Sequence, residues 1–387
     1  MTQTADFIVI GAGIAGATAG YWLAAKGRVI VLEMEDRPGY HTTGRSAAVY
    51  SEWYGNATIN ALTTGSRDFL LAPPAGFAAH ALLARRGVLL IGRADQMAAL
   101  AAAEASGRHL ERLVRLEPAA VLALCPLLRE DYVAGAVFEP EAMDIDVHAL
   151  HQGFLAGLRA RGGGVVTEAK VEALGRRNGG WLAATRAGDF AAPVVVNAAG
   201  AWADEVAILA GLAPAGLVAK RRTAILFDPP AGVEIATWPA VIDVDERFYF
   251  KPDAGKLLGS PADETPQPPA DVQAEEWDVA VAVERIQRAA RFEIRRIGHR
   301  WAGLRTFVPD KTPVVGFDPA APGFFWFAGQ GGYGIQTAPA MGRLAAALIT
   351  GVGVPPDLAR LGVDADKLSP ARIEPESAIR AGGSGDE

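Results

Sequence analysis

The stretch "DFIVIGAGIAGATAGYWLAAKGRVIVLEMED", residues 6–36, decides the fold of this chain. Its first apolar run, at 7–10, is short and rich in β-branched residues, as is typical of a parallel strand buried on both faces. Three glycines follow in the pattern G-x-G-x-x-G, then a helical segment and a second apolar strand at 28–32. This order predicts a β-α-β unit in which the glycine turn opens a helix.

The glycines have separate roles in binding a dinucleotide. Gly11 permits the tight turn, Gly13 lets the backbone approach a pyrophosphate, and Gly16 lets the helix pack on the strand. The helix N-terminus attracts the anion. Glu33 ends the second strand, where its carboxylate can accept hydrogen bonds from the ribose hydroxyls, whereas a 2′-phosphate would call for Arg or Lys. A glycine-rich turn without a ligand is the alternative, and the motif alone leaves FAD and NAD open. The residues expected at the dinucleotide here are Gly11, Gly13, Ile14, Ala15, Gly16, Glu33 and Met34.

Composition narrows the class of protein. The chain has 387 residues, half of them hydrophobic, so it can bury a large core and is expected to form two domains. A net charge of −7 argues against nucleic-acid binding. Cys125 is the single cysteine, which favours a reducing compartment. No apolar stretch is long enough to span a membrane. We expect a cytoplasmic protein, with peripheral contact to the inner membrane left open.

The rest of the chain reads as alternating α/β material, which indicates interleaved domains. Strands of a mixed or antiparallel sheet are expected within 221–260, and the proline-rich span 261–270 is expected to be a loop. The tail from about 365 is rich in proline, glycine and charge, so it is expected to be peripheral. Helices are expected at 94–128 and 147–161, and further strands near 165–166 and from 194.

The segment "MDIDVHALHQ", residues 143–152, could supply metal ligands by its spacing. The simpler interpretation is preferred: Asp146 caps the helix, Asp144 ends the preceding strand, and His148 and His151 lie on one helix face. We therefore expect no metal.

A second glycine-rich segment is "GFFWFAGQGGYGIQTAPAMG", residues 323–342, which has four glycines in six positions and no charged side chain. An apolar strand leads into it, and a helix is expected to begin near Ile335. Such a segment brings bare backbone to a helix N-terminus, where a ligand can approach closely. A loop that is glycine-rich only for packing is the alternative.

Three further motifs carry a resemblance to a known family: "HTTGRSAAVY" (41–50), "VVVNAAGAWAD" (194–204) and "WAGLRTFVPDKTPVVG" (301–316). With the 323–342 segment they resemble the D-amino-acid oxidase/glycine oxidase (DAO) superfamily of FAD enzymes. Within it the chain is most similar to the bacterial FAD-dependent D-arginine/D-amino-acid dehydrogenases, over about residues 5–370.

The resemblance implies an α/β (α+β) chain of the glutathione-reductase-like, DAO-type FAD fold. A Rossmann-type FAD-binding domain would be interleaved with a substrate domain on a mixed or antiparallel sheet. The implied division is as follows: 1–50, 145–215 and 305–350 for FAD, 51–144 and 216–304 for substrate, and 351–387 as a C-terminal extension.

It also implies non-covalent FAD, because relatives with covalent flavin use a cysteine near the C-terminus and this chain has none there. Val171 would meet the adenine through its backbone, and Ala199–Gly200 would lie near the pyrophosphate. The helix from about Ile335 would direct its positive end at the flavin's pyrimidine edge and stabilise the reduced ring. The implied FAD residues are Thr43, Arg45, Ser46, Ala47, Ala48, Val171, Ala199, Gly200, Trp202, Gly303, Arg305, Gly331, Gly332, Tyr333, Gly334, Ile335, Gln336 and Thr337.

Arg222 and Arg305 align with the family's two substrate-binding arginines, whose planar guanidinium groups suit a carboxylate. Tyr249 and Tyr54 resemble the family's active-site tyrosines, and Gly332 would offer its carbonyl to the substrate amine. The alternatives are solvated charge at a strand end for Arg222 and half-buried aromatic packing for each tyrosine.

The implied reaction is oxidative deamination of a D-amino acid: hydride passes from Cα to flavin N5, and the imino acid hydrolyses to a 2-oxo acid and ammonia. The residues expected to surround the substrate side chain, called the side-chain wall below, are apolar. Uncharged D-amino acids should therefore be preferred over D-Arg and D-Lys. Arg85 and Arg86 leave acidic substrates as a lesser alternative. The wall consists of Val49, Val88, Ala240 and Ile242.

Rival functions remain at this stage. The same fold could serve glycine, sarcosine, an imino acid or an L-2-hydroxy acid. A non-catalytic flavin subunit of an electron-transfer complex and an NAD-dependent dehydrogenase are more distant alternatives. The expected electron acceptor is a quinone, another redox partner or O₂.

Overall fold

Two large β-sheets organise the chain in the computed structural model, which describes residues 2–107, 110 and 112–373. The first sheet has six strands in the order β10-β3-β2-β14-β22-β21. All neighbours in it are parallel except β21, which pairs with β22 in antiparallel fashion. Its strands are β2 (Phe7–Ile10), β3 (Val29–Leu32), β10 (Gly164–Val166), β14 (Val194–Asn197), β21 (Val314–Phe317) and β22 (Phe324–Ala328).

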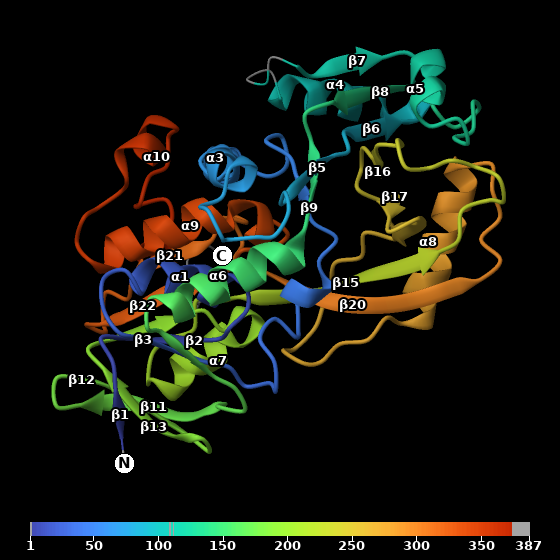
Figure 1. Cartoon of the computed structure of the whole chain (residues 1–387). Coiled ribbons are helices and arrows are strands. Elements are labelled where there is room, and N and C mark those ends of the chain that lie inside the picture. The colour runs from blue at the N-terminus through green and yellow to red at the C-terminus, as the bar shows by residue number, and fades with distance from the viewer. Residues whose placement is uncertain (1, 108–109, 111, 374–387) are drawn as a thin grey trace, which may run out of the picture.

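Both faces of this sheet are covered, which explains its near-continuous apolar strands. Helices α1 (Ile14–Leu23), α6 (Val147–Ala160) and α9 (Gly334–Ile349) pack together on one side (Figure 1). A four-stranded sheet and helix α7 (Ala203–Leu209) cover the other side. The strands of that smaller sheet are β1 (Gln3–Thr4), β11 (Val171–Arg177), β12 (Gly180–Thr185) and β13 (Gly188–Ala192).

The second large sheet is mixed and runs β19-β15-β18-β17-β16-β6-β8-β7, with β20 also paired to β15. Its core lies against helix α8 (Glu276–Ala289), whose buried Val279, Ala282 and Ile286 face Phe227 and Phe250. The strands are β6 (Val88–Gly92), β7 (Val114–Leu116), β8 (Gly135–Glu139), β15 (Val218–Phe227), β16 (Ala240–Asp243), β17 (Tyr249–Asp253), β18 (Lys256–Ser260), β19 (Thr265–Pro266) and β20 (Ile297–Phe307).

Shorter elements connect the two large sheets. Three strands form a small sheet in the order β4-β9-β5. These are β4 (Val49–Tyr50), β5 (Leu83–Arg85) and β9 (Met143–Ile145). The remaining α-helices of the described residues are α2 (Ala57–Thr64), α3 (Arg67–Leu71), α4 (Met97–Ser106), α5 (Pro118–Leu124) and α10 (Pro356–Arg360). The 3₁₀ turns are η1 (Thr43–Arg45), η2 (Ala94–Gln96), η3 (Gly200–Trp202) and η4 (Pro370–Arg372).

The expected α/β architecture is confirmed, and two local predictions were wrong. The span 94–128 is not all helix, because Val114–Leu116 forms β7 on the edge of the mixed sheet. The loop at 261–270 contains the short strand β19, which pairs with β15. In both cases pairing with a distant strand outweighs the local pattern. Residues 108–109 and 111 of the helical prediction, and 374–387 of the expected C-terminal extension, lie outside the described residues.

The segment at 143–152 is only partly as expected. Asp146 caps α6 by accepting a hydrogen bond from the Ala149 amide. Asp144, however, lies in the middle of β9 rather than at its end. His151 is not a surface residue: it is 3% exposed, and its Nε2 lies 2.8 Å from the Ala12 carbonyl oxygen. Within the described residues, no helix is both long and apolar enough to cross a membrane.

Candidate active site

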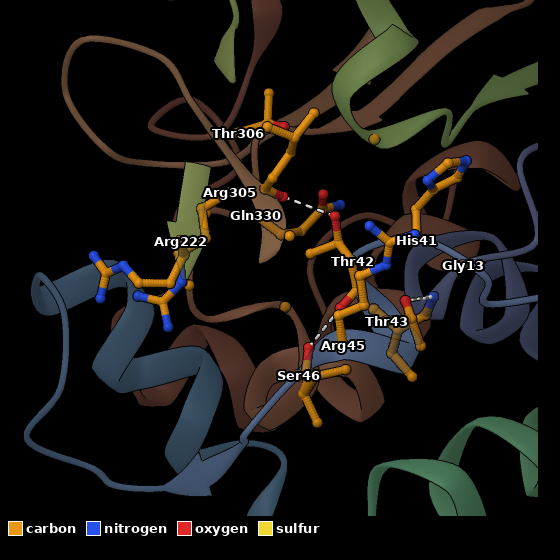
Figure 2. A pocket seen from close by; sticks show the side chains of 18 of the residues that line it. Gly13, His41, Thr42, Thr43, Arg45, Ser46, Arg222, Arg305, Thr306 and Gln330 are labelled. Atoms are coloured by element: carbon orange, nitrogen blue, oxygen red, sulfur yellow. Dashed lines mark hydrogen bonds between the residues drawn. The ribbon is translucent and has the colours of Figure 1, made fainter. Parts of the chain in front are cut away.

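A cavity of about 500 Å³ extends from the glycine turn after β2 to the face of the mixed sheet. Figure 2 shows its middle part: Gly13 and Thr43 lie on one side, Arg222 and Arg305 on the other, and Thr42 and Ser46 between them. Two ends of the cavity are distinguished by name: the nucleotide end, near Gly11, and the substrate end, near Arg305.

A glycine turn shapes the nucleotide end, which Gly11 and Gly13 line. Gly11 has a φ of +98°, and a Cβ at this position would lie 2.5 Å from the Ala198 carbonyl oxygen. A Cβ at Gly16 would lie 1.8 Å from the Gly11 carbonyl oxygen, so this glycine lets α1 pack against the turn. Gly16 itself does not line the cavity, which fits the packing role that the sequence assigned to it.

Glu33 directly follows β3 and lines the nucleotide end of the cavity. Its carboxylate accepts hydrogen bonds from the Ala12 amide at 2.8 Å and from the Glu35 amide at 3.0 Å. Burial raises the pKa of Glu33, while these backbone bonds oppose the rise. The glycine turn, the N-terminus of α1 and this lining carboxylate fit the pyrophosphate and ribose of a dinucleotide.

Between the two ends, η1 and the preceding Thr42 connect helix α1 with β20. The Thr43 hydroxyl accepts a hydrogen bond from the Ile14 amide at 2.9 Å. The Thr42 hydroxyl donates to the Leu304 carbonyl at 2.7 Å, a bond visible in Figure 2. Arg45 donates to the Ala302 carbonyl at 3.0 Å, and its side chain is therefore part of this connection. The middle of the cavity is thus fixed by contacts between segments far apart in sequence.

The second glycine segment supplies the other wall of the middle region. The Gly331 amide donates to the Thr306 carbonyl at 2.9 Å, so it is not available to a ligand, contrary to the simplest form of the prediction. The first amides of α9 have no intrahelical acceptor and lie in the lining, at Gly334 and Ile335. A Cβ at Gly332 would lie 2.8 Å from Nη1 of Arg305. A side chain at position 332 would therefore displace the guanidinium beside it.

Cationic side chains dominate the substrate end. Arg305 is partly buried and donates to the Tyr54 hydroxyl at 3.2 Å. Burial alone would lower the pKa of Arg305, but Tyr54 and Tyr249 act in the opposite direction and the pKa is raised overall. Within the described residues, no carboxylate lies within 4.0 Å of this guanidinium. An uncompensated guanidinium in a cavity wall is a site for an anion.

Arg222 is 8% exposed and also lines the cavity. It is not the solvated strand-end charge that was considered as an alternative. Its Nε donates to the Asp263 carbonyl at 2.8 Å and its Nη2 to Glu264 at 3.2 Å. Glu264 is shared with Lys220, whose Nζ lies 2.9 Å away, so one carboxylate balances two cations.

The expected side-chain wall faces this end of the cavity. Val88 and Ala240 are paired neighbours on parallel strands, as are Leu90 and Ile242, and Ile242 is opposite Tyr249. Strand pairing therefore places these side chains on one face of the mixed sheet. Val49 packs against the same group from β4.

The cavity brings together nearly all the residues that the sequence singled out. Tyr333 and Thr337 are exceptions besides Gly16: the Tyr333 ring packs at a tilt of 57° against Tyr54, with centroids 4.9 Å apart, and the Thr337 hydroxyl donates to the Tyr333 carbonyl. Those that line it are Gly11, Gly13, Ile14, Ala15, Glu33, Met34, Thr43, Arg45, Ser46, Ala47, Ala48, Val49, Tyr54, Val88, Val171, Ala199, Gly200, Trp202, Arg222, Ala240, Ile242, Tyr249, Gly303, Arg305, Gly331, Gly332, Gly334, Ile335 and Gln336.

Sequence reasoning missed several polar residues at the substrate end, among them Glu246, which lines the cavity and whose charge helps to raise the pKa of Arg305. Lys251 lines the cavity, and strand alternation from Tyr249 could have indicated it. Ser51 also lines it and donates to buried Glu139 at 2.6 Å. Burial raises the pKa of Glu139 to about 7, although hydrogen bonds from Ser51 and the Glu52 amide oppose the rise. No sequence pattern connects Ser51 with Glu139, because β8 brings the carboxylate in from a distance.

A dinucleotide cradle joined to a cationic second end is the arrangement expected of an enzyme that binds a nucleotide cofactor beside a second, smaller ligand. Residues 6–348 match the sequence profile of the family described as DAO, FAD dependent oxidoreductase. The chain belongs to this family, and FAD is its cofactor.

Two relatives illustrate the range of the family. The chain is 26% identical over 369 residues to the uncharacterized oxidoreductase YurR of Bacillus subtilis (strain 168), covering 89% of this chain and 95% of the relative. It is 25% identical to mouse mitochondrial sarcosine dehydrogenase, covering 89% of this chain and 39% of that protein. The chain thus spans well under half of the sarcosine dehydrogenase.

Solved structures confirm the DAO-type fold. Glycine oxidase from Geobacillus kaustophilus superposes with a TM-score of 0.83 at 20% identity, covering 95% of this chain and 98% of the other. L-proline dehydrogenase from P. horikoshii gives the same TM-score at 21% identity, with coverage of 96% and 98%.

Proposed function

We propose that this protein catalyses FAD-dependent oxidative deamination of an α-amino acid with a free carboxylate, of the D series. The observation that carries the proposal is Arg305, a cavity-lining guanidinium with a neutral Tyr54 hydroxyl as its hydrogen-bond partner. A substrate carboxylate would supply the missing negative charge in a bidentate arrangement.

The residues of the chain would position the substrate. Bound FAD supplies a two-electron acceptor for the hydrogen on the α-carbon. Arg305 and Arg222 hold the carboxylate, and Tyr249 and Tyr54 add hydroxyl donors beside it. Gly332 leaves its carbonyl accessible to the amine because no side chain intervenes. A substrate held at both groups has its α-carbon at a fixed place, which is the main catalytic contribution of these residues.

The side-chain wall supports selection against cations. Val88, Ala240 and Ile242 provide no carboxylate for the guanidinium of D-Arg or the ammonium of D-Lys, and an unpaired buried charge costs several kcal/mol. We therefore propose that D-amino acids with uncharged side chains are preferred over D-Arg and D-Lys.

A second candidate is oxidation of glycine, an N-methylated glycine or an imino acid at the same site. It is favoured by the similarity to proteins named sarcosine dehydrogenase, glycine oxidase and L-proline dehydrogenase. The same carboxylate anchor would serve these substrates, so the two candidates differ only in what occupies the side-chain wall.

We also propose the division of the chain into an FAD-binding and a substrate-binding domain that the sequence predicts. All six strands of the first sheet come from 1–50, 145–215 and 305–350, and those of the mixed sheet come from 51–144 and 216–304 except for the end of β20. The proposal also includes non-covalent FAD. Cys125, the single cysteine, is fully buried in the core of the mixed sheet and does not line the cavity.

The test is anaerobic mixing of the holoenzyme with D-amino acids, glycine, sarcosine and proline, followed by admission of air. We expect bleaching of the flavin by uncharged D-amino acids, and the return of colour in air distinguishes O₂ from a quinone as acceptor. Arg305→Ala should retain FAD while raising KM about a hundredfold, the loss of a charged hydrogen bond. An unchanged KM in this variant would contradict the carboxylate anchor.

A further inference from the structure

A second cationic group lies in the wall of the substrate end, on the row of the mixed sheet that contains Ala240 and Val88. Lys251 follows Tyr249 by two positions on β17, so both side chains point to the same face. Lys251 is 5% exposed and lines the cavity. A lysine this buried requires acceptors for its three N–H groups.

Asp144 provides one acceptor and is itself shared. The Lys251 ammonium donates to Oδ1 of Asp144 at 2.7 Å, and Nε of Arg86 donates to Oδ2 at 2.7 Å. Arg86 is also fixed by the carbonyls of Ala236 and Trp238, at 2.8 and 2.9 Å. Two cations therefore share one carboxylate, which leaves an excess of one positive charge in this cluster.

Of the three residues in this cluster, Lys251 is the one that lines the cavity. Among the described residues, Asp144 is the sole hydrogen-bond partner of the Lys251 ammonium, so two N–H donors remain for whatever fills the cavity. Glu139, on the neighbouring strand β8, is directed to Ser51 and the Glu52 amide instead. The cluster thus resembles Arg305 in one respect: it offers positive charge to the cavity without a matching protein anion.

We propose that Lys251 binds a second carboxylate of the substrate, at the end remote from Arg305. This inference rests on the proposed function and specifies its substrate class: a dicarboxylic amino or imino acid, with the apolar side chains of Val88 and Ala240 along its connecting methylenes. It extends the expected preference from apolar side chains to acidic ones, and Lys251 also explains why a cationic side chain would be rejected.

Binding of unreactive acids to the oxidised holoenzyme tests this directly. Glutarate, adipate and pimelate are compared by titration calorimetry with pentanoate, hexanoate and heptanoate, which lack only the second carboxylate. We expect the dicarboxylate of the fitting length to bind about tenfold to a hundredfold more tightly than its partner, the contribution of a charged hydrogen bond. In Lys251→Met the ratio should fall to about one, because Arg86 and Asp144 remain as a neutral pair.

Lys256→Met is the matched control, since Lys256 is on the adjacent strand, is partly exposed and pairs with Asp228 outside the cavity. It should keep the wild-type ratio. Equal binding of both acids by the wild-type enzyme at every length would overturn the role of Lys251 without affecting Arg305, and no variant is needed for that comparison. A dicarboxylate preference that persists in Lys251→Met would overturn it as well. Failure of all the acids to bind would remove the Arg305 anchor and this inference together.

Discussion

The nucleotide end and the substrate end of the cavity are built from different parts of the chain. Near Gly11, the glycine turn forms part of the wall, and the carboxylate of Glu33 accepts hydrogen bonds from backbone amides. Near Arg305, side chains of the mixed sheet form the wall, and positive charge exceeds negative charge at Arg305 and at Lys251. A cofactor that never changes can be recognised by backbone shape, whereas a substrate is recognised by charges that single substitutions can alter.

The largest effect is expected from Gly11→Ala, which changes the nucleotide end. The added Cβ would meet the Ala198 carbonyl, and the φ of +98° is itself unfavourable for alanine, by about 1–3 kcal/mol. We expect loss of FAD from the purified protein, measured as the flavin-to-protein absorbance ratio. Gly179→Ala is the control, because Gly179 has a similar φ of +81° with no atom within 4 Å. It should lose some thermal stability and keep its FAD; equal FAD loss in both variants would show that strain, not the cradle, is responsible.

The second prediction concerns the stability of the substrate end. The pKa of Glu139 is raised to about 7, so between pH 4.5 and about 7 the folded state holds a proton that the unfolded state has released. Stability should therefore fall as pH rises through this window and then level off, by about 3 kcal/mol in total. Glu139→Gln should lack this fall when denaturant unfolding is measured at a series of pH values. Glu130→Gln, at an exposed position, removes a comparable charge from the surface and should keep the wild-type profile.

The third prediction concerns Gly332, in the loop before α9. It tests whether the substrate end can be changed without loss of FAD from the nucleotide end. In Gly332→Ala the new Cβ would lie 2.8 Å from Nη1 of Arg305 and would displace the guanidinium. We expect kcat/KM to fall about a hundredfold with FAD content unchanged, since small displacements of a positioning group have effects of this size. Gly175→Ala, on β11 with no atom within 4 Å of the added Cβ, should match the wild type. Loss of FAD in Gly332→Ala would show that the ends are not separable here.

The smallest expected effect is that of Tyr249→Phe. Tyr249 lines the cavity, and among the described residues its hydroxyl has no protein hydrogen-bond partner, so only a bond to the substrate is removed. We expect kcat/KM to fall about tenfold, the value of one hydrogen bond. Tyr132→Phe, whose hydroxyl bonds to Asp243 outside the cavity, is the comparison. Equal activity of Tyr249→Phe and the wild type would leave the carboxylate to the arginines alone.

The nucleotide end was predictable from sequence because its constraints are local. Gly11, Gly13 and Glu33 lie within one β-α-β unit, and each follows from backbone geometry. The substrate end was predictable only where resemblance pointed to single residues such as Arg305. Lys251 and Asp144 are 107 positions apart and meet only through the pairing of distant strands, so no local pattern reports their contact. The strand Val114–Leu116 and the burial of His151 were missed for the same reason.

The long antiparallel pair β15–β20 has a further consequence for the evolution of this protein. Its register sets Arg222 opposite Gly303 and Lys220 opposite Arg305. One inserted residue in β20 would turn Arg305 to the opposite face of the sheet. A substitution at a wall residue such as Val88 leaves this register unchanged, whereas a change in the length of β20 would move Arg305 away from the cavity.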